Sequence, residues 1–214
     1  MPSPALNASL AFASLALVSG ALAAPVDPPK AEDASAMAQY QALHLSRDPS
    51  AALAGTYKLD PHHTSVVARL AHMDLSHYTL RFDDASGSFA FDPASATATH
   101  LDITVNPASV DTGDTKFDQR IATKYFEADA HPAIHFTADA VKIVGGHATI
   151  NGTLDFHGVA RPLLLTATYN GFAQSRMGFS GEATFKRSDF GVGQWAPLEG
   201  DAVSIVVETE FVRQ

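Results

Sequence analysis

Cysteine is absent from the 214 residues of this chain. That absence excludes disulfides, thiolate zinc sites, cysteine nucleophiles and the lipid-modified amino-terminal cysteine of bacterial lipoproteins. Cationic side chains are few, because lysine and arginine together number 14 against 23 aspartates and glutamates. With a formal charge of −9, the chain is a poor candidate for binding nucleic acid or anionic lipid surfaces. We expect a neutral, cationic or apolar partner.

Catalytic signatures are missing as well. The chain contains no G-x-S-x-G, H-E-x-x-H, P-loop or G-x-G-x-x-G pattern. No nucleophile–base pair can be named, so we assign no catalytic residue and expect neither enzymatic activity nor a cofactor. The apolar run near the amino terminus is shorter than the roughly 20 residues that cross a bilayer, and we expect no stable membrane insertion.

That amino-terminal run has the form of a targeting segment. Apolar residues 10–18 are followed by small residues and by Ala-Leu-Ala at 21–23, which is the pattern of a signal-peptide core and its cleavage site. No lysine or arginine precedes the run, in departure from the usual pattern. We predict a signal peptide over residues 1–23 and a periplasmic or secreted mature protein.

The remainder divides into two parts. Residues 24–55 begin as a proline-rich linker and continue with helix-forming composition, which predicts a linker with a short helix. From residue 56 apolar and polar residues alternate, as where Leu101, Ile103 and Val105 share one face of LDITVN. Several short runs of this kind, separated by glycine, asparagine and aspartate turns, indicate an all-β sandwich or barrel with antiparallel pairing.

Two segments depart from this alternation. Residues 111–132 lack it, so we expect an irregular or partly helical excursion there. Asn151-Gly152 stands inside a strand pattern, where the pair predicts a β-bulge.

The ten histidines suggest metal binding, but their spacing argues against it. Four of them cluster within residues 60–78: His62, His63, His72 and His77. Neighbours in sequence, or residues an odd number apart, point to opposite faces of a strand. His131 and His135 would lie about 13 Å apart on a strand, too far to share an ion. We assign no metal site. Convergence of histidines from distant strands, and with it a metal- or haem-dependent enzyme, stays open as an alternative.

Phenylalanine is abundant, with 13 residues, most of them on or beside the apolar strand faces. In a small barrel these faces point inward, where side chains either fill the lumen or line a cavity. The periodicity leaves both arrangements open. A barrel with a solid core would favour an interaction module over a carrier.

Several ordered motifs from Tyr57 to the carboxyl end carry a family resemblance. They are YKLDPHHTSVVARLAH, ASGSFAFDP, VNPASVDTGDTKFDQRIATKYFEADAHPAIHF, GTLDFHGVARPLLL and FKRSDFGV. Together they resemble the YceI-like, polyisoprenoid-binding periplasmic family, which has a lipocalin-like barrel. The chain departs from the family's pattern at Phe117, Arg120 and Tyr125, and residues 24–55 lie outside the resemblance.

The resemblance implies an antiparallel lipocalin-like barrel of about eight strands over residues 56–214. It also implies a bound polyisoprenoid, isoprenoid quinone or similar long-chain lipid as cargo. We expect the cargo to contact inward-facing residues: Leu70, His72, Phe82, Phe89, Phe91, Leu101, Ile103, Phe126, Ile134, Phe136, Leu154, Phe156, Leu163, Leu165, Phe179 and Phe185. His72 should face inward with Ala68 and Leu70, where it binds either a cargo head group or a buried neighbour. The sequence leaves open the identity of the lipid and the formation of a homodimer.

Overall fold

The computed structural model describes residues 31–214, so the predicted signal peptide lies outside the described residues. The chain divides into two units, one ending at Gln39 and one running from Tyr40 to Gln214. Helix α1 (Ala31–Ala42) is the short helix expected in the amino-terminal extension. Within residues 31–214 no helix is long and apolar enough to cross a bilayer.

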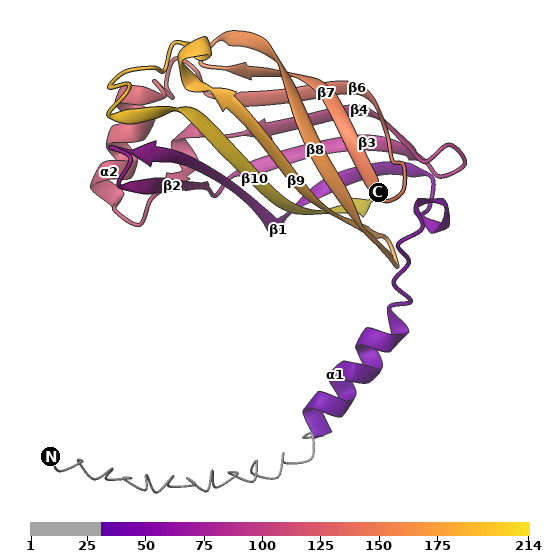
Figure 1. Cartoon of the computed structure of the whole chain (residues 1–214). Helices are drawn as coiled ribbons and strands as arrows, with labels where there is room; N and C mark the ends of the chain where they lie inside the picture. The colour runs from indigo at the N-terminus through magenta and orange to yellow at the C-terminus, as the bar shows by residue number, and fades with distance from the viewer. Residues whose placement is uncertain (1–30) are drawn as a thin grey trace, which may run out of the picture. The chain divides into compact units, whose positions relative to one another are not determined.

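Strands make up most of the second unit (Figure 1). They are β1 (Gly55–His72), β2 (Ser76–Phe82), β3 (Ala85–Asp92), β4 (Thr97–Val105), β5 (Val110–Asp111), β6 (Ile134–Lys142), β7 (His147–Phe156), β8 (Val159–Ala173), β9 (Arg176–Lys186) and β10 (Glu199–Arg213). The short helical elements are η1 (Pro49–Ala51), η2 (Pro107–Ser109), α2 (Thr115–Arg120), η3 (Ile121–Tyr125) and η4 (Arg187–Phe190). Elements α2 and η3 confirm the helical excursion predicted between residues 111 and 132.

The strands form one closed antiparallel barrel, as predicted. Their order is β10-β9-β8-β7-β6-β4-β3-β1, and β10 pairs again with β1 to complete a ring of eight. Strand β1 is long enough to pair with β3 through residues 55–58 and with β2 through residues 66–72. Strand β2 then pairs with β5 and extends the sheet beyond the ring.

The alternation along each strand sorts side chains between the inside and the outside of the barrel. On β8, Leu163 and Leu165 face the interior, whereas Leu164 between them is exposed. This is the period of two expected of a strand with one dry face and one wet face.

The pairing around Asn151-Gly152 differs on the two sides of β7. Toward β6 it stops at Thr137↔Thr153 and resumes one residue out of register at Val144↔His147, which is the kind of shift that a bulge produces. Strands β7 and β8 keep one continuous register through Asn151↔Leu164 and Gly152↔Leu163. The glycine also has a packing role, because a Cβ at Gly152 would collide with the ring of Phe136 on β6. A glycine in a strand can mark a bulge or a close approach of a neighbouring residue, and Gly152 lies where the β6–β7 pairing shifts and where Phe136 approaches closely.

One end of the barrel, which we name the closed end, contains residues 45–60 and 171–177 and is filled with side chains. Tyr57 and Met177 are fully buried there. The Tyr57 ring stacks on Phe89 with centroids 5.4 Å apart, and its hydroxyl donates to the carbonyl oxygen of Leu53 at 2.7 Å. Ser46 and Phe172 exchange two backbone hydrogen bonds and tie the segment before β1 to the end of β8.

Charged groups at the closed end are neutralised in a small network. The Asp60 carboxylate accepts from Arg176 at 2.6 Å and from His63 at 2.9 Å, and Arg176 also donates to Glu210 at 3.1 Å. The Arg176 guanidinium, followed by His63, holds the pKa of Asp60 well below its ordinary value.

Tyr169 on β8 is buried outside this network. Its burial, followed by the proximity of Tyr57 and Asp48, raises the pKa of its hydroxyl to about 12.

Candidate functional site

The barrel encloses a cavity of about 380 Å³. The lumen is therefore hollow, which decides between the cavity and the solid core that the sequence left open. Its volume lies within the range of about 300–1,000 Å³ that is typical of small-molecule sites.

Most of the residues expected to contact cargo line this cavity. They are Leu70, His72, Phe82, Phe89, Leu101, Ile103, Phe126, Ile134, Phe136, Leu154, Phe156, Leu163, Leu165, Phe179 and Phe185. Phe91 does not line it, so its assignment is corrected: the ring is buried at the closed end, edge-on to Tyr57 at 6.4 Å. Phe91 has the inward parity of β3, but it lies beyond the end of the hollow. Whether the other residues bind a ligand stays a prediction.

Part of the lining comes from elements outside the regular strands. Phe117, Ile121 and Tyr125 on α2 and η3 line the cavity, as do Val192 and Trp195 from the loop after η4. The first three are spaced four residues apart, which places side chains on one face of a helix. That spacing was a usable signal for the α2–η3 segment. No comparable periodicity marks the loop residues.

The opposite end of the barrel, which we name the mouth, is formed by α2, η3, the β1–β2 turn and residues 191–199 (Figure 1). The two cavity-lining residues that are themselves exposed, Gln194 and Trp195, both belong to this end. The cavity therefore communicates with solvent here rather than at the closed end.

Polar side chains line the cavity only near its two ends. Next to the closed end the hydroxyls of Thr64 and Thr209 bond to each other at 2.8 Å. At the mouth the lining includes His72, Gln194 and Glu199, with His72 Nε2 3.7 Å from the Glu199 carboxylate. The prediction that His72 faces inward is confirmed, although its side chain is 39% exposed rather than buried.

Arg187 holds the mouth loop in place. Its guanidinium is buried and donates to four backbone carbonyl oxygens, those of Val192, Gln194, Glu199 and Gly200, at 2.6 to 2.8 Å. These bonds fix residues 192–200 over the end of the barrel. Because carbonyls accept all four bonds, this arginine has a structural role.

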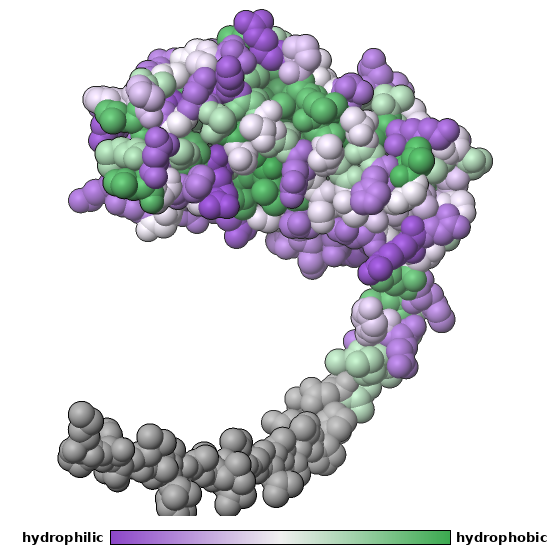
Figure 2. Space-filling model, in the orientation of Figure 1, coloured by the Kyte–Doolittle hydropathy of each residue, from purple (hydrophilic) through white to green (hydrophobic). Residues whose placement is uncertain are grey.

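Apolar side chains are exposed around the mouth. Leu75 is 81% exposed and Trp195 is 62% exposed, and Met73 and Leu198 are exposed too. The amide of Met73 donates to the carbonyl oxygen of Leu198 at 2.7 Å, so the β1–β2 turn and the mouth loop adjoin. Figure 2 shows hydrophobic residues on the surface at the end where α2 lies.

The histidines clustered at residues 60–78 form no shared site, in keeping with the spacing argument. His63 bonds to Asp60 at the closed end, whereas His72 lies at the mouth. His135 on β6 pairs with Asp102 on β4 at 2.8 Å, and His131 precedes β6 and points elsewhere. Its neighbour is His157, with ring centroids 4.3 Å apart, a pairing that the strand-spacing argument did not reveal.

Comparison with known proteins identifies the family. The model of the YceI-like domain matches residues 57–211. The chain belongs to the YceI-like family. A UPF0312 protein of Shewanella baltica is 35% identical over 175 residues, which cover 78% of this chain and 92% of the relative. A UPF0312 protein of Pseudomonas aeruginosa is 31% identical over 171 residues, which cover 76% and 90%.

Solved structures share the barrel of this YceI-like chain. BcnA of Burkholderia cenocepacia superimposes with a TM-score of 0.64 at 26% identity, covering 71% of this chain and 98% of BcnA. The YCEI protein of Campylobacter jejuni gives 0.62 at 30% identity, covering 67% and 90%. A polyisoprenoid binding domain from Saccharophagus degradans, implicated in plant cell wall breakdown, gives 0.61 at 18% identity, covering 74% and 98%. These similarities support the predicted antiparallel barrel.

Proposed function

We propose that this YceI-like protein binds a long-chain apolar molecule, of the polyisoprenoid or isoprenoid quinone class, inside its barrel. The observation that carries the proposal is the cavity: a hollow of about 380 Å³ lined along its length by aliphatic and aromatic side chains. Removing each methylene group from water contributes about 0.8 kcal/mol. A dozen such groups supply about 10 kcal/mol before the costs of association, with no charged contact needed.

The mouth suits the polar end of such a molecule. The polar lining residues beside the opening include His72, Gln194 and Glu199, and the middle of the cavity is apolar. We expect the apolar chain to enter first and the head group to stay among these three residues. The structural neighbour named as a polyisoprenoid binding domain is compatible with this cargo. At 18% identity, however, it supports the fold alone, and the proposal for the ligand rests on the cavity.

Export fits the same proposal. The pattern at residues 10–23 is that of a signal peptide, and a chain without cysteine needs no oxidative folding. We propose that the protein works outside the cytoplasm as a carrier or store of its lipid.

Trp195 provides a direct assay, because it is the single tryptophan of the chain and it lines the cavity at the mouth. Titration of the mature protein with a short-chain ubiquinone should quench its fluorescence to saturation at one equivalent. The double variant Leu165→Phe/Ala167→Phe enlarges two side chains that line the cavity from β8. Excluding about two methylene groups of ligand should weaken binding about tenfold or more.

The matched control is Leu164→Phe/Thr166→Phe, which makes the same kind of change on the exposed face of the same strand. Its quinone affinity should equal that of the wild type. Equal affinity in both double variants would show that the quinone binds outside the barrel and would refute the proposal.

A further inference from the structure

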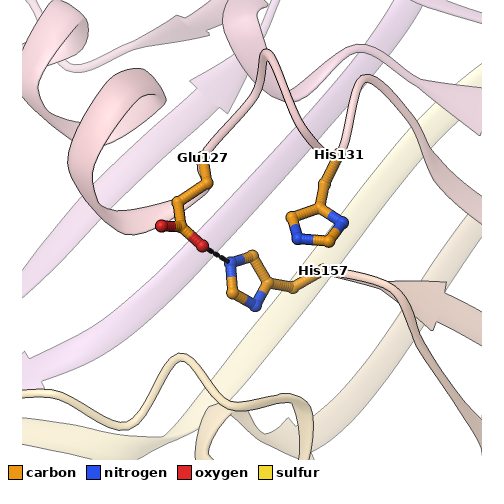
Figure 3. A group of neighbouring side chains, drawn as sticks. All are labelled: Glu127, His131 and His157. Atoms are coloured by element: carbon orange, nitrogen blue, oxygen red, sulfur yellow. Dashed lines mark hydrogen bonds and ion pairs between the residues drawn. The ribbon is translucent and has the colours of Figure 1, made fainter.

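Two histidines and a glutamate meet at the mouth end of the barrel. Glu127 and His131 lie in the loop between η3 and β6, and His157 lies in the turn between β7 and β8. Figure 3 shows the three side chains turned toward one another, and one ligand atom from each lies within 4.8 Å of the other two. We propose that this group, the Glu127–His131–His157 site, binds a divalent cation of the zinc class.

The loop backbone brings Glu127 and His131 to one side. The amide of His131 donates to the carbonyl oxygen of Glu127 at 2.9 Å. This bond closes a turn of the helical kind, on which side chains four residues apart are neighbours. Glu127 has a φ of 46°, a left-handed conformation that is uncommon for residues other than glycine, and it directs the carboxylate toward the β7–β8 turn.

That turn is shaped to accept His131. His157 and Gly158, with φ of 54° and 73°, are its two central residues, since Phe156 pairs directly with Val159. Both positions of such a turn require a positive φ. A Cβ at Gly158 would lie 3.0 Å from Cε1 of His131, so the glycine leaves the space in which the imidazole lies beside His157.

The donor set fits the chemistry of zinc. Two imidazole nitrogens and one carboxylate oxygen are the three protein ligands of an open zinc site, with water in the fourth position. His157 Nε2 and Glu127 Oε2 are already 2.9 Å apart. Bonds of about 2.1 Å in a tetrahedral site place two ligand atoms about 3.4 Å apart. The three ligand atoms lie within 4.8 Å of one another, so a small rotation of the side chains accommodates an ion.

A second group of this type shows why a cluster of carboxylates and histidine is not always a cation site. Asp60, His63 and Glu210 also gather at the closed end, but Arg176 donates to both carboxylates and supplies the positive charge. Glu127 differs, because among the ion pairs of residues 31–214 its partner is His157 alone. The Glu127 side chain is 57% exposed, which gives an ion access from solvent.

The cation would join two segments that hold the cavity wall. Phe126 and Phe156, which directly precede two of the ligands, both line the cavity with their rings 5.6 Å apart in an edge-to-face contact. A bound ion would restrain both residues and so stiffen this side of the mouth. Metal binding itself does not depend on the proposed lipid, because none of the three ligands lines the cavity.

The test is calorimetric titration of the untagged mature protein with zinc chloride after treatment with a chelator. We expect one equivalent to bind and the Tm to rise when zinc is present. His131→Ala and Glu127→Gln should each weaken binding by more than about 100-fold, since loss of even an outer partner of a ligand costs about 10- to 100-fold. Both residues lie in a surface loop, and circular dichroism will show that the variants are folded.

His135→Ala and His63→Ala are the matched controls. His135 pairs with Asp102, and His63 pairs with Asp60, whose carboxylate also binds Arg176. They should leave the zinc affinity and the zinc-dependent rise in Tm unchanged. Three results would overturn the proposal: no stoichiometric binding, an unchanged affinity in His131→Ala, or an equal loss in either control. Quinone titration of the same variants measures lipid binding separately. A negative result for zinc therefore leaves the proposed lipid site untouched, and a negative result for quinone leaves the proposed zinc site untouched.

Discussion

The two ends of the barrel are built on different principles. At the closed end aromatic rings fill the interior, the Tyr57 hydroxyl has an acceptor, and Asp60, Arg176 and Glu210 neutralise one another. At the mouth the interior is hollow, apolar side chains are exposed, and one loop depends on a single guanidinium. The closed end stabilises the fold, whereas the mouth leaves apolar surface and polar groups available for a ligand.

This difference teaches where to look for function in a barrel of this kind. A group whose hydrogen bonds and charges are already satisfied has little to offer a partner. The Asp60 network and the Glu127–His131–His157 site contain similar residue types, yet only the first contains an arginine. A cluster is structural when other groups of the chain satisfy its hydrogen bonds and neutralise its charges. It is a candidate binding site when they do not.

The largest effect is expected at Arg187. Arg187→Met removes the donor from four backbone carbonyls, and each buried acceptor left unpaired costs about 1–3 kcal/mol. The free energy of unfolding should fall by about 4 kcal/mol in urea denaturation. Arg161→Met, at an exposed position on β8, should stay within about 0.5 kcal/mol of the wild type. Equal stability in the two variants would show that the mouth loop does not depend on this side chain.

Truncating apolar side chains should separate the filled end from the hollow. Met177→Ala removes a fully buried side chain at the closed end and should cost about 3 kcal/mol. Leu165→Ala removes a partly buried side chain that borders the cavity, so fewer packing contacts are lost and about 1 kcal/mol is expected. Should Leu165→Ala cost as much as Met177→Ala in the absence of lipid, the interior would be solid.

Lowering the pH should weaken the closed end through Asp60. Its folded-state pKa is depressed by Arg176 and then by His63. The carboxylate therefore contributes stability above its ordinary pKa of 3.8 and loses that contribution as the pH falls further. Asp60→Asn should have a lower Tm than the wild type at neutral pH, and the two melting curves should converge in acid. A Tm difference that stays constant from pH 7 to below pH 3 would rule out this ion pair as the cause.

The smallest effects, and opposite in sign, are expected from two tyrosines. Within residues 31–214, Tyr169 Oη is the buried side-chain polar atom that has no hydrogen-bond partner. Tyr169→Phe should therefore leave the free energy of unfolding unchanged or raise it by up to about 1 kcal/mol. Tyr57→Phe loses the bond to Leu53 and should lower it by about 1 kcal/mol. A marked loss of stability in Tyr169→Phe would reveal a partner for its hydroxyl.

Much of the barrel could be predicted from the sequence, because alternation along a strand decides which face each residue occupies. That rule placed Leu163, Leu165 and His72 in the cavity wall correctly. It failed for Phe91, since parity gives the face of a strand but not the depth at which the hollow ends. The packing role of Gly152 was missed for a related reason: its neighbour Phe136 is 16 positions away in the chain, and only the pairing of β6 with β7 brings the two together.

The Glu127–His131–His157 group could not be found by spacing along one element. Its members come from two loops, and the strands between them determine that the loops adjoin. The rule that separated His131 from His135 was sound for a strand, but His131 lies before β6 begins at Ile134. Side chains that converge from separate loops can be recognised as one group only from the three-dimensional structure.

The most direct test of the lipid cavity is to compare native and denaturing mass spectra of the mature protein purified from a bacterial periplasm. We predict an excess mass in the native spectrum that disappears on denaturation, and a long-chain prenyl or related compound in the solvent extract. A native mass equal to that of the polypeptide alone, together with no quenching of Trp195 by added ubiquinone, would contradict the account. The hollow would then have to serve some purpose other than holding a lipid.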